Sequence, residues 1–226
     1  TNVDQYIIEK ANSWLEGKYD EESKSAIREM MKNDPEELVN SFYKDLEFGT
    51  GGMRGIMGVG TNKMNKYTVG MSTQGLANYL KKMFPGKEII KVAIAFDSRN
   101  NSQYFAKISA EVLSSNGIKV YLFDSLRPTP ELSFTIRYLK CQSGIVITAS
   151  HNPKEYNGYK VYWEDGGQLV NPHDINVIEE VKKINGIEDV NFTGDTSNIE
   201  YIGEEIDKIY IEKKQKPSRR RGRIRK

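Results

Sequence analysis

Residues 145–163 read IVITASHNPKEYNGYKVYW, and their pattern sets the geometry of the predicted sheet. Residues 145–148 form an apolar, β-branched run that is typical of a buried strand. Residues 159–163 alternate in hydropathy, which predicts another strand. Ten residues separate Thr148 from Tyr159, too few for the helical crossover that parallel neighbours need. We therefore expect a long loop between two antiparallel strands, with the later strand at an edge of the sheet.

Strand and helix patterns alternate along the chain before this stretch. The predicted elements are strands at residues 89–96 and 118–123 and helices at residues 68–83, 102–116 and 129–139. Ser102 is a candidate N-cap and Gly117 a candidate terminator of one of these helices. Later helical patterns cover residues 174–184 and 200–211. Such alternation predicts an α/β layered fold with a mostly parallel sheet.

The two ends of the chain differ from this middle part. Residues 1–45 contain helical patterns and no candidate chemistry, so we expect a helical extension that packs on a main domain at residues 46–212. The nominal net charge is +2, but residues 213–226 carry nine Lys or Arg and no acid, which leaves −7 for the rest. We expect residues 213–226 to be a basic, disordered tail. The acidic body argues against a general nucleic-acid-binding domain.

Features that report on cellular location favour the cytoplasm. Cys141 is the single cysteine, which fits a reducing compartment. No run approaches the ~18 consecutive apolar residues of a membrane span. Residues 1–12 are polar and carry acids, unlike a signal peptide. We therefore expect a cytoplasmic protein with no membrane partner.

The loop between the two antiparallel strands is the densest polar segment of the chain. Ser150 offers a hydroxyl nucleophile, His151 a titratable neighbour and Lys160 a positive charge. A hydroxyl at a strand end can carry a phosphoryl group, and nearby cations can offset its developing charge. A polar turn without function fits the residue types equally well.

The glycine-rich segment FGTGGMRG, residues 48–55, is the second candidate site. Glycines let backbone N–H groups approach an anion, and Arg54 can bind phosphate through two hydrogen bonds. The segment matches neither a Walker A loop nor the dinucleotide motif G-x-G-x-x-G. A glycine-rich hairpin without a ligand is the alternative.

Other polar segments have weaker claims to chemistry. Asp97-Ser98-Arg99 follows the predicted strand at residues 89–96, and it either supports a site or caps the next helix. Arg127-Pro128-Thr129-Pro130 and His173 fit structural roles better than catalytic ones. No set of His, Cys, Asp and Glu has the spacing of a metal site.

Three motifs in this order resemble those of the α-D-phosphohexomutases, the phosphoglucomutase and phosphomannomutase enzymes. They are the glycine-rich segment ending in Arg54-Gly55, then Asp97-Ser98-Arg99, then TASHNP at residues 148–153 followed by Tyr156-Asn157-Gly158 and Lys160. TNKMN at residues 61–65 and the helical extension are similar to the longer subgroup, which includes phosphoglucomutases that also take phosphopentoses. The resemblance covers residues 46–211. It implies the first of four domains, with a mixed four-stranded sheet between two helical layers.

The resemblance also implies a role for each motif residue. Ser150 would carry the phosphoryl group as a phosphoserine, donate it to a hexose phosphate and take back the other phosphate of the resulting hexose 1,6-bisphosphate. Arg54 and Lys160 would stabilise the transferring group, and His151 would assist positioning or proton movement. Supporting residues would be Thr50, Gly51, Gly52, Asp97, Arg99, Asn152 and Asn157. The enzyme would interconvert hexose 1-phosphate and hexose 6-phosphate, with glucose or mannose as the sugar.

The chain lacks three segments that the family pattern contains. The family's Mg2+ loop, an Asp-Gly-Asp-Gly-Asp-Arg type segment of the second domain, does not occur, nor do the later sugar-recognition and phosphate-binding loops. Ser150 would offer Mg2+ one ligand through its phosphate, while the three carboxylates are absent. We therefore expect a domain that needs the C-terminal domains of a full-length enzyme and is inactive alone.

Two other functions stay open at this point. The chain could be a non-catalytic phosphosugar-binding module. Attachment to nucleic acid or to a membrane through residues 213–226 has less support, because no aromatic residue is interleaved in that run.

Overall fold

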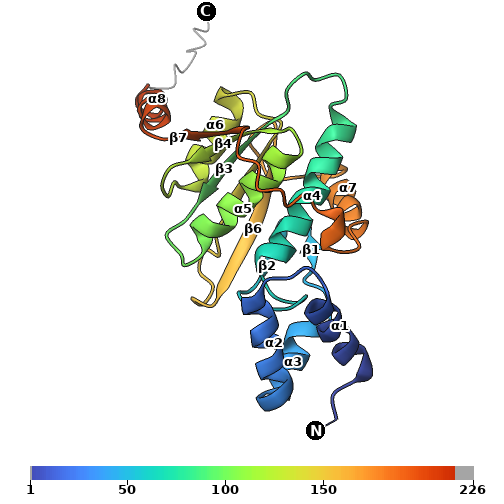
Figure 1. Ribbon diagram of the computed structural model, residues 1–226. Coiled ribbons are helices and arrows are strands. Elements are labelled where there is room, and N and C mark those ends of the chain that lie inside the picture. Colours follow the sequence, from blue (N-terminus) through green and yellow to red (C-terminus); the bar gives the residue numbers. More distant parts are fainter. Residues whose placement is uncertain (1, 217–226) are drawn as a thin grey trace, which may run out of the picture.

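Successive side chains of a strand point to opposite faces of the sheet, and each face has its own apolar cluster. In the computed structural model, which describes residues 2–216, the even-numbered residues of β3 (Lys91–Phe96) join one cluster, and Ala93 and Ala95 join the other. The first cluster takes side chains from three helices, α4 (Lys66–Met83), α5 (Ser102–Ser115) and α7 (His173–Lys182). The second takes them from α6 (Thr129–Tyr138) and α8 (Glu204–Gln215). A helical layer therefore covers each face of one sheet (Figure 1).

The sheet has seven strands in the order β1-β2-β6-β5-β3-β4-β7. The other strands are β1 (Phe48–Gly49), β2 (Gly52–Ile56), β4 (Lys119–Phe123), β5 (Ser143–Ile147), β6 (Tyr156–Trp163) and β7 (Ile199–Ile202). Strands β5, β3, β4 and β7 run parallel, whereas β1, β2 and β6 pair antiparallel with their neighbours. Parallel strands have their carboxyl ends at the same side of the sheet, so the loops after β3, β4 and β5 lie along that side.

The predicted α/β fold is confirmed, but the predicted four strands were too few. The prediction that β6 is antiparallel is correct, and its position at the sheet edge is wrong, because β2 pairs with its other side. Glycine-rich β2 has little intrinsic strand preference, and β1 is only two residues long. The spacing at residues 200–211 predicts a helix over the whole stretch. In the structure, β7 occupies its first residues and α8 only the later ones.

Two smaller predictions also differ from the structure. The N-cap of α5 is Asn101, with φ of 65°, and not Ser102, which is the first helical residue. Helix α8 continues to Gln215, so the first residues of the predicted disordered tail are helical, while residues 217–226 lie outside the described part. None of the helices between residues 2 and 216 combines the length and hydropathy of a membrane-crossing segment.

The N-terminal extension consists of three helices, α1 (Gln5–Glu16), α2 (Glu21–Asn33) and α3 (Pro35–Phe42). They share a core with Tyr67, which lies in the first turn of α4. The Tyr67 hydroxyl donates to Asp20 Oδ2 at 2.6 Å and accepts the Asp20 N–H at 2.8 Å. The extension therefore packs on the end of the domain where α4 begins (Figure 1).

Candidate active site

Ser150 lies in the loop at residues 148–155, called the serine loop below, directly after the fully buried strand β5. Its side chain is exposed, and its φ of 52° is in the left-handed region, which is rare for a residue other than glycine. Its N–H donates to Thr148 Oγ1 at 3.2 Å. The turn places the hydroxyl outside the core, at the edge where the parallel strands end.

Lys160 brings a positive charge to this hydroxyl. It lies on β6, and its Nζ is 3.5 Å from Ser150 Oγ. Within residues 2–216 no carboxylate forms an ion pair with it. A phosphoryl group on Oγ would lie within reach of this ammonium group, which can offset the charge on its oxygens.

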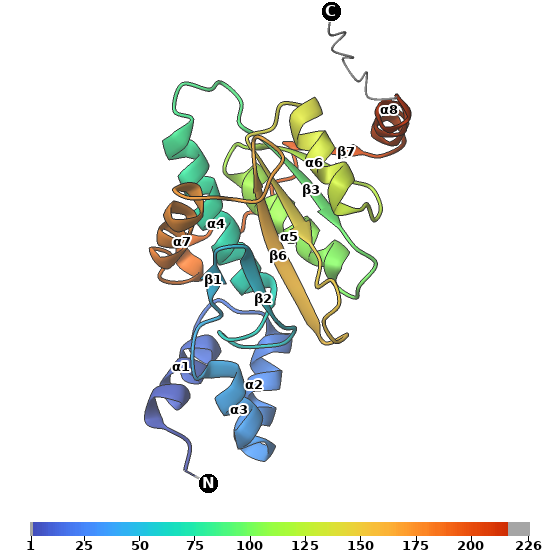
Figure 2. The same ribbon diagram turned by 180° about the vertical axis from the view of Figure 1, so that it is seen from behind.

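Arg54 lies on the same face of the sheet as Lys160. In the β2–β6 register, Gly52 is opposite Lys160 and Arg54 is opposite Gly158. Cross-strand partners, and residues two apart in one strand, point to the same face. Arg54 is exposed, and Figure 2 shows α6 over the half of this face near β3, while β6 and β2 are uncovered. The structure gives Arg54 no hydrogen bond to the described residues of the serine loop.

The glycine-rich segment is a hairpin that also holds Arg54 in place. Gly49 pairs with Gly52, so Thr50 and Gly51 form a two-residue turn between β1 and β2. Gly52 has φ of 123°, and a Cβ there would lie 1.9 Å from the carbonyl oxygen of Tyr159. Only glycine lets β2 pair with β6 at this point. A hollow of about 410 Å³ beside Arg54 is lined by Lys44, Leu46, Glu47, Gly49, Gly52, Arg54 and Asn62.

Arg99 holds the serine loop from the end of β3. Its guanidinium group donates to three carbonyl oxygens, those of Ser150 at 3.2 Å, Tyr156 at 3.1 Å and Pro153. The backbone N–H of Arg99 donates to Asp97 Oδ1 at 2.9 Å. The guanidinium is therefore committed to the loop backbone, so Arg99 supports the loop and is not directed at a phosphate.

Asn157 connects the start of β6 to the end of β3. It is fully buried, and its Nδ2 donates to Ser102 Oγ at 2.9 Å. The Ser102 hydroxyl in turn donates to Asp97 Oδ1 at 2.6 Å. The Asn157 Oδ1 accepts the Gly158 N–H at 2.8 Å. These bonds join the second and third motifs of the sequence through buried or half-buried polar groups.

The remaining predicted residues lie in the loop itself. Asn152 Nδ2 donates to the carbonyl oxygen of Ala149 at 2.8 Å, which closes the turn around Ser150. His151 is exposed, and its side chain has no hydrogen-bond partner among residues 2–216. The structure thus brings Ser150, Lys160 and Arg99 into direct contact, and it leaves His151 in solvent.

Sequence reasoning missed three contributors to this geometry. Ser102 was expected to be a helix cap, and it is the bridge between Asn157 and Asp97. Thr148 binds the Ser150 N–H. Gly158 is packed so closely that a Cβ would lie 2.5 Å from the Thr148 carbonyl oxygen. Spacing carries no signal for these contacts, which exist only once β6 lies beside β5.

The described residues do not fit a complete Mg2+ site. No group of three or more His, Cys, Asp and Glu within residues 2–216 could hold a metal ion. Asp97, which lies behind the serine loop, already accepts two hydrogen bonds on Oδ1. Because Mg2+ requires near-octahedral oxygen ligands, we assign no chemical step of this chain to the ion.

Comparison with known proteins decides the family. The sequence profile described as phosphoglucomutase/phosphomannomutase, alpha/beta/alpha domain I, matches residues 45–187. The chain belongs to the phosphoglucomutase/phosphomannomutase family. The match covers all three motifs as far as Lys160, and the predicted resemblance is confirmed. The members of this family are phosphosugar mutases, and the domain boundaries at residues 45/46 and 212/213 stay a prediction.

Individual members of the phosphoglucomutase/phosphomannomutase family are similar over most of this chain. Human phosphopentomutase is 38% identical over 187 residues, which are 80% of this chain and 31% of that protein. A Staphylococcus epidermidis phosphoglucomutase is 43% identical over 159 residues, 70% of this chain and 28% of that protein. A solved structure of a putative phosphomannomutase from Thermus thermophilus matches with a TM-score of 0.55 at 29% identity, over 61% of this chain and 30% of that one. The chain spans less than a third of the length of these relatives.

Proposed function

We propose that this chain is the serine-bearing domain of a phosphosugar mutase that interconverts hexose 1-phosphate and hexose 6-phosphate. The observation that carries the proposal is the 3.5 Å contact between Lys160 Nζ and Ser150 Oγ, on an exposed left-handed turn at the strand end. Arg54 on the same face offers a second cation. Membership of the family supports phosphosugar transfer as the reaction class.

The proposed cycle starts from a phosphoserine at Ser150. A free hydroxyl oxygen of the hexose phosphate bonds to phosphorus while the bond from phosphorus to Ser150 Oγ breaks. The substrate hydroxyl loses a proton to a base, and Oγ gains one, so the products are Ser150 and a hexose 1,6-bisphosphate. The bisphosphate then reorients, and its other phosphate returns to Oγ by the reverse transfer. Lys160 would offset charge on Oγ as it leaves, and exposed His151 would assist positioning or proton movement.

Turnover in this proposal needs parts beyond the present chain. The face that carries Arg54 and Lys160 is uncovered at β2 and β6 (Figure 2), and exclusion of water would require further domains over it. Carboxylate ligands for Mg2+ would come from the same domains. The isolated chain is therefore proposed to accept or bind phosphosugars without completing the cycle.

Phosphate transfer to Ser150 tests this proposal directly. The chain is incubated with glucose 1,6-bisphosphate and Mg2+, alone and fused to the remaining domains of the S. epidermidis phosphoglucomutase, and the phosphorylated residue is mapped by mass spectrometry. We expect phosphate on Ser150, none in Ser150→Ala, and unchanged labelling in Ser98→Ala, a neighbouring serine. Label on another residue, or no label on Ser150 even in the fusion, would contradict the proposal. A parallel incubation with ribose 1,5-bisphosphate decides between hexose and pentose substrates.

A non-catalytic phosphosugar-binding module is the second candidate. The cations Arg54 and Lys160 favour it, since neither forms an ion pair within residues 2–216. Calorimetry with glucose 1-phosphate distinguishes the two functions when it is combined with the labelling experiment. Binding without any phosphate on Ser150 would favour the module.

A further inference from the structure

A second polar cluster lies between α6 and α8, and the proposed chemistry does not use it. This cluster, called the Arg127 cluster, consists of Asp124 and Arg127 after β4, Glu131 in α6 and Asp207 in α8. Arg127 Nε donates to Asp207 Oδ1 at 2.7 Å, and its Nη2 donates to Asp207 Oδ2 at 2.9 Å. Its Nη1 donates to the Ser125 hydroxyl and to the Leu126 carbonyl oxygen. The guanidinium group is thus bound on every side.

Glu131 is left without a donor beside this guanidinium group. The residue is 5% exposed, and its Oε2 is buried with no hydrogen-bond partner among residues 2–216. The nearest cation atom, Arg127 Nε, is 3.8 Å away and already binds Asp207. An ionised carboxylate is unfavourable in a buried place that offers it no hydrogen bond. Two neighbouring carboxylates that share one cation also tend to keep one proton between them.

The electrostatics of the cluster agree with this geometry. Burial, together with the adjacent Asp207 carboxylate, raises the pKa of Glu131 to about 7, against the effect of Arg127. The hydrogen bond from Arg127 holds the pKa of Asp207 below its usual value. Below about pH 7, therefore, Asp207 carries the charge and Glu131 carries the proton.

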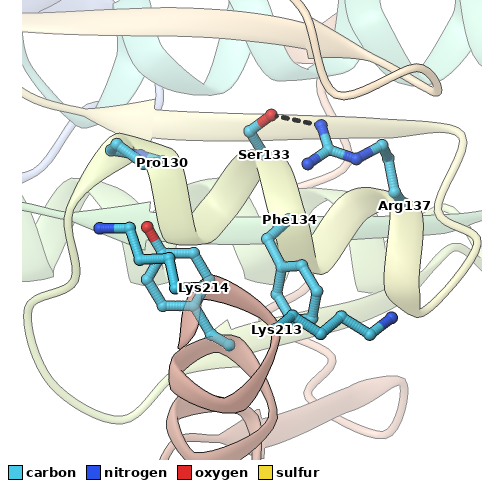
Figure 3. Close-up of a pocket in the computed structure, with 7 residues that line it drawn as sticks. Pro130, Ser133, Phe134, Arg137, Lys213 and Lys214 are labelled. Atoms are coloured by element: carbon cyan, nitrogen blue, oxygen red, sulfur yellow. Dashed lines mark hydrogen bonds between the residues drawn. The ribbon is translucent and has the colours of Figure 1, made fainter. Parts of the chain in front are cut away.

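Helix α8 contacts the domain through the Arg127–Asp207 ion pair and through apolar side chains. Ile206 is buried in the first half of the helix, next to Asp207. Towards the end of α8, a surface hollow of about 370 Å³ is lined by Lys213 and Lys214 of α8 and by Phe134 and Arg137 of α6 (Figure 3). The second half of α8 still contacts α6, because the Tyr210 ring lies 5.4 Å from the Phe134 ring and Lys213 Nζ lies over the rings of Phe134 and Tyr138.

We propose that a proton on Glu131, beside the Arg127–Asp207 ion pair, holds α8 on α6, and that loss of this proton loosens the helix. The proposal does not depend on the role of Ser150. Arg127 also donates its backbone N–H to the Phe96 carbonyl oxygen at 3.1 Å, directly before Asp97. The Arg127 cluster therefore lies at the same edge of the sheet as the serine loop, and it sets the direction in which α8 leaves that edge.

The direction of the pH effect follows from Glu131. Its pKa is about 7 when α8 is docked and returns toward its usual value of 4.5 when α8 is released into water. The contribution of Glu131 to docking is therefore full below about pH 4.5 and is lost as the pH rises through about 7. Asp207 stays ionised through this range because its pKa is lowered. Glu204 and Lys208, on the same helix, are exposed and pair with each other at 3.2 Å.

Hydrogen exchange of the whole chain tests the proposal. Protection factors for the amides of residues 206–211, corrected for intrinsic exchange rates, are measured at pH 5.5 and pH 8. In the wild-type chain we expect a fall on the order of tenfold between these values. Glu131→Gln, which is neutral at every pH, should keep high protection at both. Glu212→Gln makes the same chemical change at an exposed position of α8 and should behave like the wild type.

Two outcomes would overturn the proposal. One is wild-type protection of α8 that does not change between pH 5.5 and pH 8, and the other is the wild-type pH dependence in Glu131→Gln. Amides of β3 show whether the variant is folded. If it is not, the carboxyl carbon of Glu131, followed by nuclear magnetic resonance in the wild-type chain, decides: a titration midpoint below pH 5 would sink the idea.

Discussion

At the scale of single residues, the site depends on backbone positions that tolerate few side chains. Gly52 has φ of 123° and lies against the Tyr159 carbonyl oxygen. Gly51 is its neighbour in the same hairpin, and a Cβ there would meet nothing within 4 Å. Ser150 adopts a left-handed conformation without being glycine. Such a conformation persists only where surrounding contacts hold it, and here the contacts come from Thr148 and Arg99.

The hairpin glycines give a matched pair of variants. Gly52→Ala should lower the free energy of unfolding by about 2–4 kcal/mol, because the new Cβ meets backbone and the φ is unfavourable. Gly51→Ala should change it by less than about 1 kcal/mol. Urea denaturation followed by circular dichroism measures both. Equal losses in the two variants would show that the close approach of β2 to β6 is not what requires glycine.

Substitution of Arg99 by lysine distinguishes the hydrogen bonds of its guanidinium group from its positive charge. Arg99→Lys keeps a cation but cannot reach three carbonyl oxygens in one plane. We expect amides of residues 150–156 to exchange about tenfold faster, which is the effect expected from the loss of one hydrogen bond to a charged group. Phosphate labelling of Ser150 should slow by a similar factor. Arg137→Lys, which alters an exposed arginine bonded to Ser133, serves as the control. Unchanged exchange in Arg99→Lys would mean that the loop holds its shape without the guanidinium group.

At the scale of elements, a polar contact joins the N-terminal extension to the domain. Asp20 caps α2 by accepting the Ser23 N–H at 2.7 Å, and it also binds the Tyr67 hydroxyl of α4. Burial raises the pKa of Asp20, but the hydrogen bonds from Tyr67 and Ser23 outweigh it and hold the pKa below the usual 3.8. One carboxylate therefore caps the start of α2 and binds α4.

Removal of the Tyr67 hydroxyl should weaken this docking in a pH-dependent way. Tyr67→Phe should lose about 1 kcal/mol of unfolding free energy above pH 5. A carboxyl group whose pKa is lowered by folding stabilises the fold above its unfolded value and loses that effect as the pH falls. The difference from the wild type should therefore shrink below pH 4 in urea titrations.

Tyr19→Phe is the control for this measurement. The Tyr19 ring stacks on Trp14 at 4.1 Å, and its hydroxyl has no hydrogen-bond partner among the described residues. The variant should show no such pH dependence. A loss in Tyr67→Phe that stays constant from pH 6 to pH 3 would mean that Asp20 is not the partner that matters.

At the scale of the whole molecule, the proposed function makes this chain one wall of a site. It spans less than a third of its relatives, and the face that carries Arg54 and Lys160 is uncovered at β2 and β6 (Figure 2). A reacting phosphosugar needs contacts that exclude water and orient both of its ends. In the proposed function, further domains supply those contacts.

Fusion to the remaining domains of the S. epidermidis phosphoglucomutase should restore turnover. We expect no measurable conversion of glucose 1-phosphate by the isolated chain and clear activity in the fusion, in a coupled assay for glucose 6-phosphate. The fusion with Ser150→Ala should lose activity on the order of 10³-fold or more. Activity that survives this substitution would remove Ser150 from the mechanism.

Local sequence patterns were sufficient for part of this description. Helices α4 to α7 and strands β3 to β6 lie within a few residues of their predicted positions, because periodicity and glycine or proline breaks act over short distances. The three motifs were sufficient for the family, since each brings its chemical groups together within a few residues. The parallel direction of β3, β4 and β5 also agrees with the predicted alternation of strands and helices.

Long-range contacts determined the rest. β1, β2 and β7 exist because neighbouring strands pair with them, and glycine-rich β2 has no strand pattern of its own. That pairing turns β6 from an edge strand into an internal one and places Arg54 on the face of Lys160. Arg99 reaches carbonyl oxygens more than fifty residues away, and burial together with Asp207 of the distant helix α8 raises the pKa of Glu131. Hydrogen bonds and burial between distant segments have no counterpart in local spacing, so only the folded chain shows them.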